Sequence, residues 1–243
     1  MLTLKPWKIE SALQMLLGLF GGISFAGFLA YGVGYRPVPN HIDHLMLIVS
    51  AISFHGAGLL WLHWLLRDHE FTWRGVLGLD AGSVAKSAML GVAVGVMGFF
   101  GCNLLNGLVI DVLARFGRQP EAQSTVMALQ STPSPAWMIA FGVISIGLAP
   151  LVEEVIFRGL LFSILKQLGL PWLAWWGTAI LFALSHANLQ AFLPLMVLAL
   201  ALAWLYDRTD NLMASVLAHA TFNGINFIMA IRFGALAHGG GHL

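Results

Sequence analysis

Long apolar stretches, separated by short polar connections, follow one another along most of the 243-residue chain. Crossing the hydrocarbon of a bilayer takes about 20 apolar residues as a helix, with a range of roughly 17–25. The stretches lack the period-two alternation of barrel strands and are longer than such strands. We therefore predict helices, because each helix satisfies its own backbone hydrogen bonds in lipid. Seven stretches qualify, near residues 11–35, 44–66, 88–113, 136–168, 171–187, 189–206 and 212–233.

The composition agrees with an integral, multi-pass membrane protein whose surroundings are the lipid bilayer. Hydrophobic residues make up 58% of the chain and charged residues 9%, whereas a soluble domain carries about 25% charged residues. Disorder would need low hydrophobicity and high net charge. The formal net charge of +1 gives no reason to expect a nucleic-acid partner. Cys102 is the one cysteine, so the chain has neither an intrachain disulfide nor a thiolate zinc site.

The chain is predicted to be an all-α, polytopic helical bundle that forms a single membrane domain over residues 1–243. It shows no internal repeat and no low-complexity tract apart from a glycine-rich tail. The longest connections are residues 67–86 and 117–137. The second of these divides a front part with three spans, residues 1–116, from a back part with four helices, residues 136–233.

The fourth predicted span carries charges where a bilayer makes them costly. A lone charge at the bilayer centre costs about 2.5–3.5 kcal/mol on insertion scales, and such residues usually mark function. Glu154 and Arg158 are four residues apart, so they share a helix face and can pair. Glu153 points about 100° away from Glu154, on the face of Phe157. We expect Arg158 to hold Glu154 ionised and Glu153 to face a cavity, the alternative being one self-compensating network that joins helices.

Two later spans each carry polar side chains on one helix face. Phe182 and His186 are four residues apart, and so are His219 and Asn223. An interfacial histidine and simple hydrogen bonding between helices are the alternatives to a functional role. Because the rest of each helix is apolar, we expect the polar faces of the three spans to meet around one water-filled pocket.

These side chains suit the hydrolysis of an amide bond inside the membrane. A carboxylate removed from bulk water is a better base, so Glu153 can take a proton from a water that His186 orients. His219 and Asn223 can donate hydrogen bonds to the oxyanion of the attacked carbonyl. Two histidines and glutamates also suggest zinc. The spacing His-Glu-x-x-His is absent and the candidate ligands lie on three helices, so zinc is not favoured and no cofactor is expected.

Taken together, the motifs resemble those of the CPBP intramembrane proteases, also called the Abi or CAAX-protease-like family. The resemblance covers roughly residues 136–233, and its motifs are Glu153-Glu154-x-x-Phe157-Arg158-Gly159, Phe182-x-x-x-His186 and His219-x-x-x-Asn223. Members of this family include endopeptidases that cleave after a prenylated cysteine, and bacterial members linked to bacteriocin maturation or self-immunity. Studied relatives often show eight spans, where this chain shows seven.

The resemblance implies a glutamate-type endopeptidase in a bacterial or archaeal cell membrane, acting on a membrane-associated peptide or a lipidated protein. It implies that Glu153 and His186 activate water without a metal ion, and that His219 and Asn223 form the oxyanion hole. The predicted catalytic set is Glu153, Glu154, Arg158, His186, His219 and Asn223.

Two other functions are alternatives to a peptidase, and several polar residues lie outside the three motifs. A non-catalytic immunity factor or scaffold of the same fold is the main alternative, whereas a proton-coupled transporter would show internal repeats and interrupted helices in matching halves. His55 and His63 are eight residues apart and about 80° apart in projection, so they do not form a ligand pair and are interpreted as interhelical or interfacial. Asn103 and Asn106 can hydrate a substrate path or make packing bonds.

Overall fold

The computed structural model describes residues 5, 7, 9–35, 44–79, 84–119, 124–131 and 134–239, and every regular element in these ranges is a helix. Six helices are long and apolar enough to cross a membrane, and a shorter apolar helix spans Leu173–Ser185. These helices correspond to the seven predicted stretches, which confirms the prediction of a polytopic helical bundle. The single-domain description of residues 1–243 stays a prediction.

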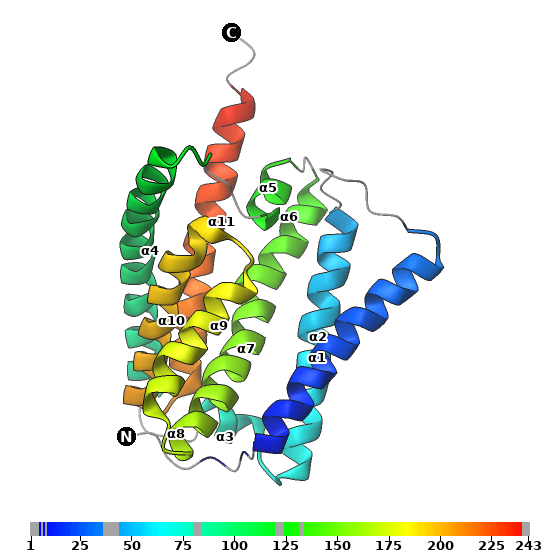
Figure 1. Ribbon diagram of the computed structural model, residues 1–243, viewed down its shortest axis with the longest axis vertical. Coiled ribbons are helices and arrows are strands. Elements are labelled where there is room, and N and C mark those ends of the chain that lie inside the picture. The colour runs from blue at the N-terminus through cyan, green and yellow to red at the C-terminus, as the bar shows by residue number, and fades with distance from the viewer. Residues whose placement is uncertain are drawn as a thin grey trace.

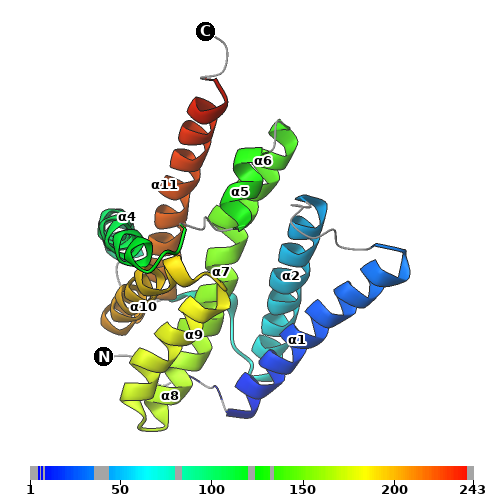
Figure 2. The same cartoon turned by 45° about the horizontal axis from the view of Figure 1, so that its top comes forward.

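The front part of the chain supplies three long helices to opposite sides of the bundle. They are α1 (Ile9–Gly32), α2 (His44–Asp68) and α4 (Val84–Arg115). Helices α1 and α2 pack against each other on one side, and α4 lies on the other side against the last two helices of the chain (Figures 1 and 2). The front part therefore flanks the back part from two directions.

Two short helices lie in the long connections between predicted spans, where sequence reasoning had not placed any. They are α3 (Trp73–Leu77) and α5 (Ser124–Ser131). Local capping explains α3, because the Thr72 hydroxyl accepts a hydrogen bond from the backbone N–H of Gly75 at 3.1 Å. Gly78, the residue directly after α3, lies at the end of the bundle, where its carbonyl accepts a hydrogen bond from the Asn211 amide at 2.9 Å.

The fourth span is one continuous run of helix, Pro135–Gln167, that changes its winding along its length. Its segments are α6 (Pro135–Gly142), η1 (Val143–Leu148), α7 (Ala149–Glu154), η2 (Val155–Phe162) and α8 (Ser163–Gln167). The two η segments are π-helical, a wider winding that occurs often at functional sites. The six-residue segment that carries both glutamates thus lies between two widened stretches.

The back part continues with four further segments that surround the fourth span. They are η3 (Leu173–Gly177), α9 (Thr178–Ser185), α10 (Leu189–Thr209) and α11 (Leu212–Gly239). In both views α7 lies between the α1–α2 pair and the group formed by α4, α10 and α11 (Figures 1 and 2). The central position of α7 places its acidic residues in the interior of the bundle.

Small residues allow α4 and α11 to approach each other closely. A Cβ atom at Gly91 would lie 2.4 Å from the Ala214 carbonyl oxygen, and one at Gly95 would lie 2.4 Å from that of Ala218. Two glycines spaced four apart are a common solution for helix pairs in membranes, because they let the backbones meet. The close contact between Gly95 and Ala218 sets the position of α11 at the residue directly before His219.

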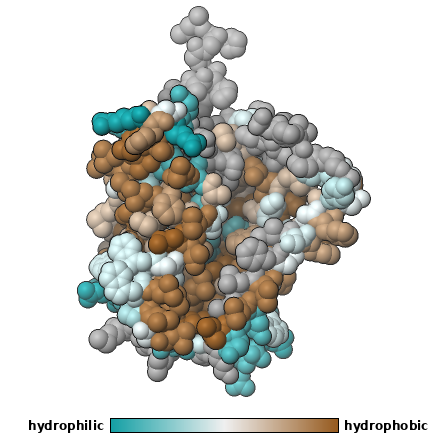
Figure 3. Space-filling model, in the orientation of Figure 1, coloured by the Kyte–Doolittle hydropathy of each residue, from teal (hydrophilic) through white to brown (hydrophobic). Residues whose placement is uncertain are grey.

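The surface of the bundle has the distribution that a membrane requires. Hydrophobic residues cover the middle of the visible face, and hydrophilic residues gather toward its upper and lower ends (Figure 3). Large apolar side chains such as Leu60, Phe100 and Leu104 are exposed. Exposed apolar side chains on long helices are expected where lipid is the solvent.

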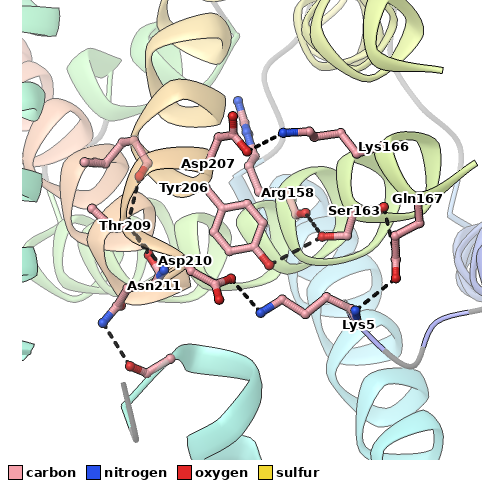
Figure 4. Close-up of polar contacts among 12 residues, drawn as sticks. Lys5, Arg158, Ser163, Lys166, Gln167, Tyr206, Asp207, Thr209, Asp210 and Asn211 are labelled. Carbon is pink, nitrogen blue, oxygen red and sulfur yellow. Dashed lines mark hydrogen bonds and ion pairs between the residues drawn. The ribbon is translucent and has the colours of Figure 1, made fainter. Parts of the chain in front are cut away.

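Ion pairs and hydrogen bonds tie the N-terminal segment and α8 to the end of α10 (Figure 4). The Lys5 ammonium binds the Asp210 carboxylate at 2.7 Å, and Lys166 pairs with Asp207. The backbone N–H of Lys5 also donates to the Gln167 side chain at 2.9 Å. These contacts close one end of the bundle around the fourth span.

Candidate functional site

A cavity of about 490 Å³ opens among the helices of the bundle. It receives side chains from the front part, α2 and α4, as well as from α5, α6, η1, α7, α10, α11 and the turn after α9. Four of the six predicted catalytic residues line it, namely Glu153, His186, His219 and Asn223. The expectation that three polar helix faces meet around one pocket thus agrees with the geometry.

Glu153, on α7, presents its carboxylate to two imidazole rings. Its Oε1 lies 3.7 Å from Nε2 of His55, and its Oε2 lies 3.9 Å from Nε2 of His219. Both separations exceed a hydrogen bond, which joins these atom types at about 2.7–3.2 Å. The carboxylate is mostly buried, with 17% of the side chain exposed, and Oε2 has no hydrogen-bond partner among the described residues. Glu153 is therefore held near two rings without being bonded to either.

Glu154 has a different environment, with its side chain completely buried. Its Oε1 accepts one hydrogen bond from Nη1 of Arg158 at 2.8 Å and another from Nδ1 of His219 at 2.9 Å. Arg158, also buried, donates from Nη2 to the Ala199 carbonyl of α10 at 3.0 Å. The pairing of Glu154 with Arg158 follows the spacing that predicted it. Neither residue is among those that line the cavity, and the pair contacts it through the bond from His219 to Glu154.

The contact with Glu154 determines which nitrogen of the His219 ring donates a hydrogen bond to that carboxylate. A carboxylate paired with arginine only accepts hydrogen bonds, so Nδ1 of His219 must be the donor to Glu154. Nε2 of the same ring is then left toward the cavity and Glu153. A carboxylate that orients a histidine through its second nitrogen is a common arrangement in catalytic sites.

His186, at the end of α9, is oriented by the backbone of its own helix. Its Nδ1 lies 2.8 Å from the Phe182 carbonyl, which can only accept, so Nε2 is the ring nitrogen without this contact. The buried Phe182 ring contacts His186 and His219, with centroids 4.9 Å and 5.6 Å away. The Arg158 guanidinium also lies 4.7 Å from its centroid, a cation–π distance. Phe182 therefore joins the parts of the site that lie on α9, η2 and α11.

Asn223 lies one helical turn beyond His219 on α11, half-buried at the cavity. Its Nδ2 donates to the Ser145 carbonyl of η1 at 2.8 Å. An amide nitrogen carries two N–H donors, so this bond fixes the side chain and leaves one donor for another acceptor. The predicted role of an oxyanion donor is compatible with that geometry.

His55 is the residue of this site that sequence reasoning did not connect with it. The ring lies on α2, lines the same cavity and has 9% of its side chain exposed. His55 of α2 faces Glu153 of α7, which agrees with its interpretation as an interhelical residue. The contact itself could not be predicted, because no spacing rule relates two residues that are 98 positions apart. The available signal was a histidine in the middle of an apolar span, which is costly in a bilayer.

The remaining polar residues of the front part line the cavity but bond to neighbours. Asn103 donates to the Phe99 carbonyl at 2.8 Å, and Asn106 accepts from the Gln190 amide at 3.3 Å. These are packing bonds between neighbouring residues. Because both asparagines also line the cavity, they make its wall more polar. Within the described ranges, no group of three or more histidine, cysteine, aspartate or glutamate side chains is arranged to hold a metal ion.

Comparison with known proteins gives a consistent result. Residues 135–225 match the family described as type II CAAX prenyl endopeptidase Rce1-like. The chain is 26% identical over 200 residues to the "Putative membrane peptidase YdiL" of Bacillus subtilis, covering 82% of this chain and 78% of that protein. It is 29% identical over 77 residues to the "UPF0177 protein YxdF" of Lactococcus lactis, covering 31% of this chain and 42% of that protein. No solved structure matches.

The matched segment contains all six predicted site residues. The resemblance read from the three motifs is thereby confirmed, and the candidate spans together with the bacterial relatives identify a multi-pass bacterial membrane protein.

Proposed function

We propose that this protein, whose residues 135–225 belong to the CAAX-protease-like family, is an intramembrane endopeptidase that uses Glu153 as the base. The observation that carries the proposal is one cavity, formed within membrane spans, that is lined by Glu153, His186, His219 and Asn223 together. A peptidase needs a base for water and donors for the oxyanion at the same place. These four side chains supply both functions.

In the proposed reaction, Glu153 takes a proton from a water that His186 orients, and the water oxygen attacks the carbonyl carbon of the scissile bond. The π electron pair of the carbonyl moves to its oxygen, which is stabilised by Asn223 and by Nε2–H of His219, acting as an imidazolium whose Nδ1–H donates to Glu154. The intermediate collapses when the C–N bond breaks, and the proton held by Glu153 moves to the leaving nitrogen. Glu154 and Arg158 keep the His219 ring in place through the bond to Nδ1.

The cavity wall supports a substrate that is itself bound to the membrane. Beside the polar groups, the cavity is lined by apolar side chains such as Leu47, Ile48, Phe141 and Phe227. A peptide with an attached lipid chain, or a peptide within the bilayer, offers apolar groups for such a wall and an amide bond for the polar part. We propose a membrane-associated peptide or a lipidated protein as the substrate.

The substrate can be found by comparing membranes that contain the wild-type protein with membranes that contain Glu153→Gln. Mass spectrometry of membrane peptides and lipidated proteins should reveal species that accumulate uncut only with the variant. Identical peptide profiles, with both proteins inserted at equal levels, would contradict an endopeptidase that depends on Glu153.

Replacing Asn223 with alanine is expected to lower kcat by about 10²–10³-fold, because loss of one oxyanion donor has that effect in other hydrolases. KM should change little, since the donor acts on charge that develops during the reaction. The matched control is Ser215→Ala on the same helix, where the buried hydroxyl donates to the Leu202 carbonyl at 3.0 Å. That variant should lower the melting temperature and leave kcat unchanged. The reverse pattern would place the functional contact at Ser215 instead.

Prolonged treatment with a metal chelator is expected to leave the cleavage rate unchanged. The proposed route activates water with the Glu153 carboxylate and stabilises the oxyanion with side-chain N–H groups, so no step requires a metal ion. The measurement is the cleavage rate before and after dialysis against the chelator, with a zinc peptidase as the positive control for metal removal. Loss of activity that added zinc restores would contradict the metal-independent route.

A further inference from the structure

A histidine from the front part of the chain, His55, lies beside Glu153, the proposed catalytic base. His55 of α2 is at least nine-tenths buried, lines the cavity and points Nε2 at Oε1 of Glu153 across 3.7 Å. His63, two turns further along α2, is exposed and stacks on Trp73. His55 and His63 thus have opposite environments on one helix, and of this pair it is His55 that faces the carboxylate.

The backbone of α2 determines which nitrogen of His55 can accept a hydrogen bond. Nδ1 lies 2.6 Å from the Ala51 carbonyl, which only accepts, so Nδ1 carries the proton of the neutral ring. Nε2 then presents a lone pair to the carboxylate of Glu153, which also has only lone pairs. Accordingly, Nε2 of His55 has no hydrogen-bond partner in the described part of the chain.

This mismatch disappears when Glu153 carries a proton. A protonated carboxyl group is a donor, and an imidazole nitrogen with a free lone pair is its natural acceptor. Closing the gap from 3.7 Å to hydrogen-bonding distance needs a shift of about 1 Å. Rotation about the side-chain bonds of Glu153 can supply that shift.

We propose that His55 is a positioning residue of the site, which holds Glu153 by an O–H···N hydrogen bond after Glu153 has taken the proton from water. The proposal rests on the proposed function and deepens it. The proton stays on Oε1 while Nε2 of His55 accepts, so no net charge moves to α2, and the same proton then passes to the leaving nitrogen. His219, on the other side of Glu153, serves the oxyanion in the proposed reaction as an imidazolium, with Nδ1–H donating to Glu154 and Nε2–H directed to the cavity.

The proposed role of His55 makes the front part of the chain contribute to the active site. The four-helix back part, residues 136–233, contains all residues of the family motifs, yet the base is complete only when α2 packs against α7. The front part would then be a component of the active site in addition to a part of the bundle.

The test compares His55→Ala, His55→Phe and His63→Ala in the full-length protein. The substrate is the peptide that accumulates uncut in membranes containing Glu153→Gln. Both His55 variants should lower kcat by about 10–100-fold, the size of effect seen when the hydrogen-bond partner of a metal-bound side chain is removed, with KM within about twofold of the wild type. Free imidazole should restore part of the activity of His55→Ala. It should not restore His55→Phe, because the phenyl ring fills the space. His63→Ala should behave as the wild type.

The phenylalanine variant separates packing from hydrogen bonding, since it keeps the ring and removes the acceptor. Wild-type kcat in His55→Phe would overturn the proposal, and so would a loss in folded His55→Ala that imidazole does not restore. If His55→Ala fails to fold, the kcat of His55→Phe decides alone. Cleavage that survives Glu153→Gln would instead refute the proposed function, so the two failures can be told apart.

Discussion

Replacing Glu153 with glutamine is expected to lower the rate of peptide cleavage by about 10²–10⁴-fold, the contribution typical of a general base. Glutamine has nearly the same size as glutamate but cannot take up the proton of water. In the part of the chain that the structure describes, the Glu153 carboxylate lies 3.7 Å from His55 and 3.9 Å from His219, and its Oε2 has no hydrogen-bond partner. The substitution should therefore leave insertion and the melting temperature close to those of the wild type.

The matched control is Glu10→Gln, the same chemical change at an exposed position near the start of α1. It should leave both the rate and the melting temperature unchanged. The measurement combines initial rates on the identified substrate with thermal unfolding in detergent. Cleavage that survives in Glu153→Gln would remove Glu153 as the base. Biological activity that persists in the absence of any cleavage would favour the non-catalytic immunity factor or scaffold.

The parts of the site that could be predicted from sequence are those that local helical geometry fixes. Glu154 and Arg158 are four residues apart and are bonded at 2.8 Å. Spacing also separated Glu153 from Glu154, and the two carboxylates do face different surroundings. These relations depend only on the period of a single helix, so they hold however the helices pack against one another.

The meeting of the three polar faces could be predicted for a different reason. A polar side chain inside a membrane span must find a polar partner or water. With few polar residues available in the back part, the helices that carry Glu153, His186 and His219 had few ways to satisfy them. The resulting common cavity follows from this scarcity.

Relations between distant helices could not be predicted from one sequence. His55 is placed beside Glu153 by the packing of α2 on α7, and nothing in the spacing of either helix encodes that contact. The π-helical segments beside α7 were not predicted either, since no residue pattern in the fourth span marks the change of winding. Sequence reasoning also placed Glu154 and Arg158 in the catalytic set, whereas they lie behind the cavity wall and contact His219. Their catalytic role remains a prediction.

Replacing Arg158 with methionine is expected to reduce the free energy of unfolding by about 3–5 kcal/mol, since breaking a buried ion pair leaves its partner uncompensated. Glu154 is completely buried, and without Arg158 its remaining hydrogen bond is to His219. Methionine fills similar volume, so the loss reports the charge and its hydrogen bonds more than a cavity. Thermal unfolding in detergent would show the change as a lower melting temperature.

Two further variants make this stability prediction specific. Lys166 lies on the same span as Arg158 and forms a partly exposed pair with Asp207 of α10. Lys166→Met removes the cation of that pair, and such pairs contribute about 0–1 kcal/mol to stability. Removing both buried charges, with Glu154→Leu and Arg158→Met together, should recover part of the stability that Arg158→Met alone loses, because no uncompensated charge then remains. The double variant should still cleave slowly, since Nδ1 of His219 has lost the acceptor that orients the ring. Recovery of stability without recovery of kcat would separate the structural effect of the Glu154–Arg158 pair from its effect on His219. An Arg158→Met variant that melts at the wild-type temperature would contradict the predicted loss of stability.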